Sequence, residues 1–169
     1  MIKKLGLAAL ALASLAAPAL AAEKMTVETS DGCSFDIALR SDIAPKHVAQ
    51  YTKLAKAGFY DGVVFHRVID GFMAQGGDVQ FGNTGSPSFD PGRAGTGSSK
   101  KGNLKQEFSR ESHTRGVCSM ARAQNPDSAN SQFFICFDDA RFLDNQYTVW
   151  GEVISGMEHI DALPKGEPP

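Results

Sequence analysis

FHRVIDGFMAQGGD, at residues 65–78, places an arginine, an amide and several large apolar side chains close together in the chain. Alternate side chains of a β-strand share one face. We therefore expect Phe65, Arg67 and Ile69 to point one way and Val68 to point the other way. A cation beside an apolar surface is poorly suited to a core, so this segment predicts a binding or catalytic site built on strands.

A second segment has the same character. The sequence SMAR, at residues 119–122, leads through a polar loop to SQFFI, at residues 131–135. By the same alternation, Gln132 and Phe134 share a face, while Phe133 and Ile135 lie on the opposite face. This segment therefore also combines a polar and an aromatic side chain on one side of a strand.

The motifs FHRVI, GFM, QGGD and SQFFI, in this order, closely resemble the cyclophilin family of peptidyl-prolyl cis-trans isomerases, and in particular its exported bacterial members. The resemblance implies a mainly β fold, a closed antiparallel eight-stranded barrel capped by two helices, with the site on the outer wall. It implies an enzyme that accelerates isomerisation of X-Pro bonds during the folding of exported proteins. The expected partners are proline-containing unfolded or folding polypeptides.

The resemblance also implies the role of each site residue. Arg67 is the expected catalytic residue, because its fixed donors can stabilise the twisted amide. Gln75 is expected to hydrogen-bond and orient it. The substrate-binding residues that the resemblance implies are Phe72, Met73, Gln75, Ala121, Arg122, Gln132, Phe134, Phe142, Leu143 and Tyr147. No cofactor is expected, and the histidines and cysteines show no metal-ligand spacing.

Three of these positions depart from the best-known eukaryotic pattern. Phe142 stands where those members carry Trp, Tyr147 where they carry His, and Arg122 where they carry Asn. Phe142 keeps an apolar wall but lacks the indole donor. We therefore expect isomerase activity with weak binding of cyclosporin.

The N-terminus has the pattern of a secretory signal peptide. Lys3 and Lys4 precede an uncharged apolar run, and small residues follow at the end of that run. The alternative is a membrane anchor, but the run is shorter than the ~20 residues that span a bilayer. We expect a signal peptide over residues 1–21, cleaved after Ala21 or Ala22, and an isomerase domain over residues 22–169. The expected location is the periplasm, with no membrane attachment after cleavage.

Charge argues against nucleic acid as a partner. The 169 residues carry a net charge of −2, and removal of residues 1–21 leaves 15 basic against 19 acidic residues. A peptide-binding chaperone (holdase) on a cyclophilin scaffold is the alternative function. A pure binder could dispense with Arg67, so its presence together with Gln75, Phe72 and Phe134 favours the isomerase. A secreted protease is less well supported, because Ser131 has no recognisable triad partners.

The cysteine count is odd, so at least one of Cys33, Cys118 and Cys136 is unpaired. If Ala121 and Phe134 both face the site, strand parity places Cys118 and Cys136 on opposite faces of the sheet. They could not then form a disulfide, and buried free thiols are expected.

The remaining pattern predicts the order of the elements. Strands are expected at 24–29, 34–39, 116–121, 132–137 and 147–154, with helices from an N-cap at Asp42 to Gly58 and over 156–163. Residues 81–105 are expected to form a surface loop that could border the site. Family members have a further strand that closes the barrel against the first strand. The two terminal prolines cannot supply it, so we expect an open edge at 24–29.

Overall fold

The computed structural model describes residues 23–167, so the predicted signal peptide at 1–21 lies outside the described residues. Seven strands form one antiparallel sheet in the order β1-β2-β7-β5-β6-β4-β3. They are β1 (Lys24–Glu28), β2 (Ser34–Leu39), β3 (Arg67–Ile69), β4 (Met73–Gly76), β5 (Val117–Met120), β6 (Phe133–Cys136) and β7 (Val149–Ser155). The mainly β, antiparallel fold that the sequence predicts is confirmed.

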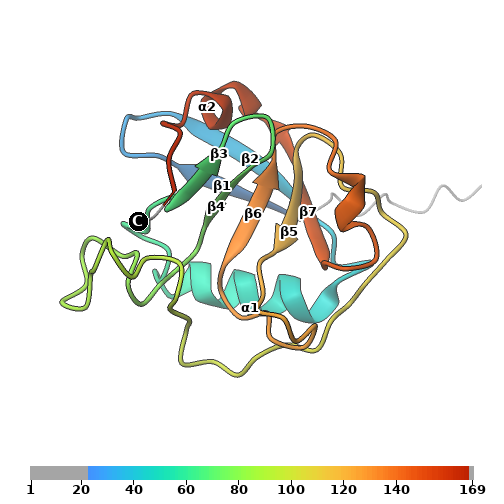
Figure 1. Cartoon of the computed structure of the whole chain (residues 1–169), viewed down its shortest axis with the longest axis horizontal. Coiled ribbons are helices and arrows are strands. Elements are labelled where there is room, and N and C mark those ends of the chain that lie inside the picture. Colours follow the sequence, from blue (N-terminus) through green and yellow to red (C-terminus); the bar gives the residue numbers. More distant parts are fainter. Residues whose placement is uncertain (1–22, 168–169) are drawn as a thin grey trace, which may run out of the picture.

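Two α-helices and one 3₁₀-helix accompany the sheet: α1 (Pro45–Lys56), α2 (Met157–Asp161) and η1 (Arg141–Leu143). The sheet curls into a half-barrel, with α1 across one end and α2 at the other (Figure 1). The predicted pair of capping helices is therefore present. Among residues 23–167, no helix has the length and apolar character that a membrane span requires.

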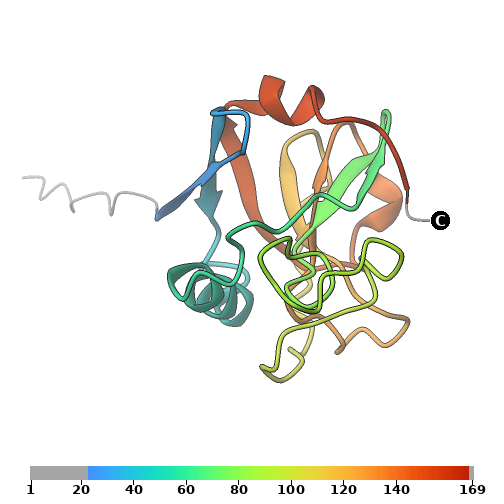
Figure 2. The ribbon, with the colours of Figure 1, turned by 90° about the vertical axis from the view of Figure 1, so that its left-hand side faces the viewer.

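The half-barrel is open between its two edge strands. Figure 2 shows β1 and β2 on one side of the molecule and β3 and β4 on the other. A groove of about 980 Å³ lies between these edges, with Met25 and Val27 on one wall and Phe65 and Val68 on the other. The closing eighth strand of the expected barrel is not among the described residues, and the open edge expected at β1 is observed.

The interior of the half-barrel holds the main core, which contains Phe35, Ile37 and Ile135 from the strands. Helix α1 closes one end with Tyr51, whose ring packs 4.2 Å from that of Trp150, centroid to centroid. Val48 and Leu54 are buried beside it. Val48, Tyr51 and Leu54, at helical spacing, thus form the buried face of α1.

The predicted N-cap of this helix is wrong. Helix α1 begins at Pro45, with Ala44 at the cap position and no side-chain cap. The Asp42 carboxylate instead accepts two hydrogen bonds of 2.9 Å from Arg40. Glu107, from a distant loop, accepts the backbone N–H groups of Lys46 and His47. A carboxylate from another part of the chain therefore satisfies the free amides of this helix.

The loop at 81–105 contains no helix or strand, as predicted. The three cysteines are free. Cys118 lies in the main core, whereas Cys136 lies in a second apolar cluster on the other face of the sheet. The prediction that strand parity keeps these two thiols apart is confirmed.

Candidate functional site

A row of four residues crosses four neighbouring strands on the outer wall of the half-barrel. Arg67 of β3 pairs with Gln75 of β4, Gln75 pairs with Phe134 of β6, and Phe134 pairs with Ser119 of β5. Directly paired residues of adjacent strands point to the same face of a sheet. The register therefore lines up the predicted catalytic cation, its amide neighbour and an aromatic ring.

An apolar cluster lies beside this row. Its buried members are Met73, Phe134, Cys136, Ala140 and Leu143, and its half-buried members are Ile69, Phe72, Ala121 and Tyr147. Six of these residues are predicted substrate contacts: Phe72, Met73, Ala121, Phe134, Leu143 and Tyr147. They come from β4, β6, η1 and the loops that follow β3, β5 and η1, so only the folded sheet brings them together.

The aromatic rings in this region meet at defined angles. The rings of Phe134 and Tyr147 lie 5.6 Å apart, edge to face at 84°. Phe72 packs 5.6 Å from Phe142, whose side chain stands 67% exposed. Phe142 therefore presents a large apolar surface to solvent at the rim of the cluster, at the position where the sequence predicts a substrate contact.

Arg67 reaches from β3 with its side chain 37% exposed, and its Nε donates a 2.8 Å hydrogen bond to Oε2 of Glu167. Gln75 donates instead to Oε1 of Gln132 at 3.0 Å. Among residues 23–167, no side-chain hydrogen bond joins Arg67 to Gln75, so the expected hydrogen bond between these two cross-strand neighbours is absent. The sequence did not predict the contact with Glu167, since the two residues lie in segments far apart in the chain.

Gln132, which accepts the hydrogen bond from Gln75, also connects the site to the loop at 81–105. Its Nε2 donates to the backbone oxygens of Gly95 and Gly97 at 2.9 and 2.7 Å. The predicted loop therefore does border the candidate site. Gly95 has a φ of +99°, a backbone conformation that suits glycine.

Asp78 holds this loop in place, and sequence analysis did not identify it. The buried carboxylate accepts four backbone N–H groups, from Gln80, Phe81, Gly95 and Gly97. Burial alone would raise the pKa of Asp78, but these hydrogen bonds hold it below its ordinary value. A Cβ at Gly97 would collide with the carboxylate. An aspartate directly after Gly76-Gly77 and before a glycine-rich loop is the signal that could have indicated this role.

The side chain of Arg122, one of the predicted substrate-binding residues, is bonded to neighbouring loops. Its guanidinium donates to the backbone oxygens of Ala123, Gln124 and Gln146 at 2.7–3.1 Å. The same group lies 4.6 Å from the ring centroid of Tyr147. Arg122 therefore holds two loops together and covers one face of Tyr147.

One prediction of strand parity is wrong. Phe65 does not share the surroundings of Arg67 and Ile69, because β3 begins only at Arg67. Phe65 packs against the main core, with its ring 6.1 Å from that of Phe133. Ile69 does lie against the apolar cluster, and Val68 faces the interior, as the alternation predicts.

Neither the thiol of the apolar cluster nor a cluster of metal ligands offers reactive chemistry at this surface among residues 23–167. Burial raises the pKa of the Cys136 thiol to about 12, so this sulfur stays protonated and is not a nucleophile. Within residues 23–167, no group of three or more His, Cys, Asp or Glu side chains is arranged to hold a metal ion. The arrangement can hold an apolar ring beside a guanidinium.

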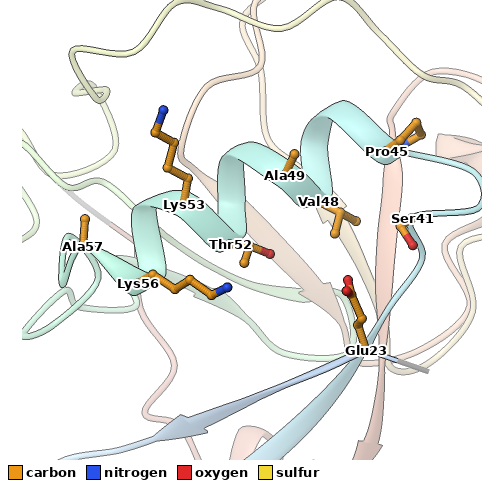
Figure 3. Close-up of a pocket in the computed structure, with 9 residues that line it drawn as sticks. All are labelled: Glu23, Ser41, Pro45, Val48, Ala49, Thr52, Lys53, Lys56 and Ala57. Atoms are coloured by element: carbon orange, nitrogen blue, oxygen red, sulfur yellow. The ribbon is translucent and has the colours of Figure 1, made fainter. Parts of the chain in front are cut away.

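A separate hollow lies on the outer side of α1 and contains none of the predicted site residues. It runs between α1 and the start of β1, and Figure 3 shows Glu23, Thr52 and Lys56 around it. Its remaining lining consists of Ser41, Pro45, Val48, Ala49, Lys53 and Ala57. Because it lies apart from the row of Arg67 and from the apolar cluster, it is not part of the candidate site.

Comparisons with known proteins agree with this geometry. The sequence model for "Cyclophilin type peptidyl-prolyl cis-trans isomerase/CLD" matches residues 24–168. A probable peptidyl-prolyl cis-trans isomerase of Brucella suis is 59% identical over 130 residues, which cover 77% of this chain and 66% of that protein. Peptidyl-prolyl cis-trans isomerase B of Bacillus subtilis is 37% identical over 139 residues, 81% of this chain and 87% of that protein.

Solved structures show the same fold. A cyclophilin from Hirschia baltica superposes with a TM-score of 0.71 at 30% identity, covering 85% of this chain and 68% of that one. A cyclophilin-type isomerase from Cryptosporidium parvum, solved in the presence of the dipeptide Ala-Pro, gives a TM-score of 0.72 at 26% identity. That match covers 86% of this chain and 89% of the other.

Proposed function

Because the chain belongs to the cyclophilin-type peptidyl-prolyl cis-trans isomerase family, we propose that it accelerates cis-trans isomerisation of X-Pro bonds in polypeptides. The proposal rests on one observation above all. Arg67 lies in cross-strand register with Gln75 and Phe134, directly beside the apolar cluster of Met73 and Leu143. A proline ring seated on that cluster would bring its amide to the guanidinium.

The reaction needs no bond cleavage. An X-Pro bond rotates slowly because amide resonance sets a barrier of ~18–20 kcal/mol. Twisting the bond removes that resonance and leaves a lone pair on the prolyl nitrogen. A donor that meets this lone pair binds the twisted amide more tightly than either planar form, and this difference accelerates rotation.

The side chains divide this task between them. Phe134, Leu143 and Tyr147 would hold the proline ring on the apolar cluster, and Arg67 would donate to the prolyl nitrogen. Arg67 is suited to this because a guanidinium is a cation whose five N–H donors lie in a rigid plane. Gln75 and Gln132, joined to each other and to the loop at 95–97, form the polar edge along which the peptide backbone would lie.

The substrates that we propose are exported proteins that fold in the periplasm. The periplasmic location is supported by the pattern at residues 1–21, where two lysines precede an uncharged apolar run. Expression of the full chain, followed by cell fractionation and mass determination of the mature N-terminus, tests it. Cleavage after Ala21 or Ala22 and recovery in the periplasmic fraction are expected, whereas an uncleaved cytoplasmic protein contradicts the proposal.

Isomerase activity is tested by NMR exchange spectroscopy on an Ala-Pro-containing peptide. The mature protein should accelerate exchange between the cis and trans forms, and Arg67→Ala should remove most of that effect. Arg40→Ala is the matched control, because Arg40 also pairs with carboxylates, on Asp42 and Glu111, but at residues outside the candidate site.

Peptide binding measured on the same samples separates the isomerase from the chaperone alternative. We expect Arg67→Ala to keep peptide affinity within a few-fold, since the apolar cluster is intact, while catalysis falls. A folded wild-type protein that binds the peptide without accelerating exchange would favour a holdase. Equal catalysis by wild type and Arg67→Ala would contradict the proposed mechanism.

A further inference from the structure

We propose that His113 is a positioning residue that fixes η1, Phe134 and Tyr147 of the apolar cluster relative to one another. This inference rests on the proposed function, because it concerns the geometry in which a proline ring would be held. His113 belongs to no predicted site motif, and its side chain is completely buried.

His113 secures both ends of η1, the short helix that carries Phe142 and Leu143. At the start of η1, the backbone N–H of Ala140 donates to the oxygen of His113 at 2.8 Å. At its end, Oδ1 of Asp144 accepts the backbone N–H of His113 at 2.7 Å and lies 2.9 Å from the ring Nδ1. His113 is therefore bonded to both ends of η1 and fixes the position of this helix in the apolar cluster.

The imidazole of His113 also contacts residues of β5 and β6. Its Nε2 lies 3.0 Å from Oγ of Ser119, the β5 residue that pairs with Phe134. The ring also stacks on Phe134, with centroids 6.1 Å apart and an interplanar angle of 19°. Tyr147 meets it edge-on at 6.5 Å. His113 thus contacts Phe134 and Tyr147 as well as the two ends of η1.

The order Asp144–His113–Ser119 resembles a hydrolytic triad, but the arrangement cannot act as one. The Ser119 hydroxyl is fully buried and already donates to the backbone oxygen of Thr148 at 2.9 Å. A nucleophile needs open space beside it and an oxyanion site within reach. Ser119 lies within β5 and is fully covered by its neighbours, so these three side chains form a fixed internal connection.

Both ring nitrogens of His113 have partners, which offsets the cost of burying a polar ring. The comparison with His47 is informative. His47 is also fully buried and also pairs with a carboxylate, with Nδ1 2.6 Å from Oε2 of Glu107. Its Nε2, however, is buried without a partner, and it lies in α1, which contributes nothing to the apolar cluster. His47 therefore offers a matched control for a purely structural role.

The test compares His113→Phe with His47→Phe. Phenylalanine keeps a ring that can stack on Phe134 but removes both polar contacts. Displacement of reacting groups by about 1 Å can reduce a rate by roughly 100-fold. We expect His113→Phe to lower kcat/KM for an Ala-Pro peptide by at least ~10-fold, measured by NMR exchange at a temperature where circular dichroism shows it folded. His47→Phe should lower the melting temperature and leave kcat/KM within about twofold of wild type.

Two further variants keep the test decisive if His113→Phe does not fold. Asp144→Ala removes the connection to η1 at a half-buried position, and it should lower kcat/KM in the same direction. His113→Asn keeps a donor that can reach Asp144, and it should recover part of the activity. Backbone NMR shifts of Phe142 and Leu143 should move in Asp144→Ala and not in His47→Phe.

The outcomes separate this inference from the proposed function. A wild-type protein that does not accelerate exchange contradicts the proposed function. An active wild type with folded His113→Phe or Asp144→Ala at wild-type kcat/KM overturns the role of His113 and leaves the isomerase intact. Equal losses in His47→Phe and His113→Phe would also overturn it, since the effect would then be one of general stability.

Discussion

The carboxylate of Glu167 lies 2.8 Å from Nε of Arg67, although the two residues stand 100 positions apart in the sequence. The backbone next to Glu167 explains this approach. Gly166 exchanges two hydrogen bonds with Val68, so the segment after α2 runs along the free edge of β3 (Figure 1). An acidic side chain is thereby delivered to the proposed catalytic cation.

We predict that this ion pair contributes little to catalysis. Its side chains are 37% and 53% exposed, and exposed pairs contribute about 0.2–1 kcal/mol. Glu167→Gln should therefore change kcat/KM by less than about fivefold, whereas Arg67→Ala should lower it by roughly 100-fold, as loss of a transition-state donor does. Exchange spectroscopy on both variants checks this. A loss in Glu167→Gln comparable to that in Arg67→Ala would show that the carboxylate belongs to the catalytic machinery.

We predict a loss of stability as the pH falls below about 6.5, the ordinary value for histidine. Burial lowers the pKa of His47 in the folded protein, so the unfolded chain takes up the proton first and is favoured by acid. His66 acts in the same direction for the same reason. Below about pH 4.5, Glu107 adds to the effect, because hydrogen bonds with His47 and Lys46 outweigh burial and hold its pKa below the ordinary value.

Urea unfolding at a series of pH values between about 5 and 8 measures this loss. His47→Gln removes one titrating group and should flatten the profile. A wild-type free energy of unfolding that is constant across this range would contradict the assignment.

We predict weak cyclosporin binding and tighter binding by Phe142→Trp. Phe142 is 67% exposed at the rim of the apolar cluster, so a larger ring can be accommodated there without repacking a core. The indole adds an N–H donor that phenylalanine lacks. Titration calorimetry should show an affinity gain of about tenfold, the factor that one net hydrogen bond of ~1.4 kcal/mol provides.

The control is Phe89→Trp, since Phe89 is an exposed aromatic residue of the loop at 81–105. Equal affinities for wild type and Phe142→Trp would show that Phe142 is not the limiting contact.

We predict that extending the chain with the closing strand of the family raises the melting temperature by roughly 4–8 °C. Met25 and Val27 line the groove between β1 and β3 and are half-buried. Fully burying an exposed side chain of this kind contributes about 1.5–3 kcal/mol, so covering the exposed halves of both contributes about 2 kcal/mol, and each kcal/mol raises the melting temperature by about 2–4 °C. Among residues 23–167, β1 is an edge strand with one side unpaired, and such an edge also favours pairing between molecules. Size-exclusion chromatography should therefore show dimers of the chain ending at Pro169 as its concentration rises, and a monomer of the extended chain. Identical melting temperatures and two clean monomers would contradict the prediction.

Much of the sheet could be predicted because strand alternation is a local property. The opposite faces of Val68 and Ile69 follow from parity alone, whereas those of Cys118 and Cys136 follow from parity once Ala121 and Phe134 are both placed at the site. Phe65 was misplaced because parity says nothing about where a strand begins, and β3 begins at Arg67.

The contacts that escaped prediction are long-range and polar. Asp42 has a suitable position for a helix cap, but its carboxylate accepts a hydrogen bond from Arg40, two residues earlier. The backbone N–H of Lys46 instead donates to Glu107, 61 residues further along the chain. His113 gave no local signal, because its significance depends on Asp144 and Ser119, which meet it only in the folded chain. The roles of the site residues themselves came from motifs and stay predictions until they are measured.

The four amides that converge on Asp78 have a consequence for the dynamics of the loop. Amides that share one acceptor lose protection from hydrogen exchange together when that acceptor is released. Deuterium uptake at Phe81, Gly95 and Gly97 should therefore follow one common opening rate, although these residues are widely spaced in the chain. That opening would also withdraw the carbonyls to which Gln132 donates. A local unfolding event in the loop would then reach the polar edge of the site without disturbing the sheet.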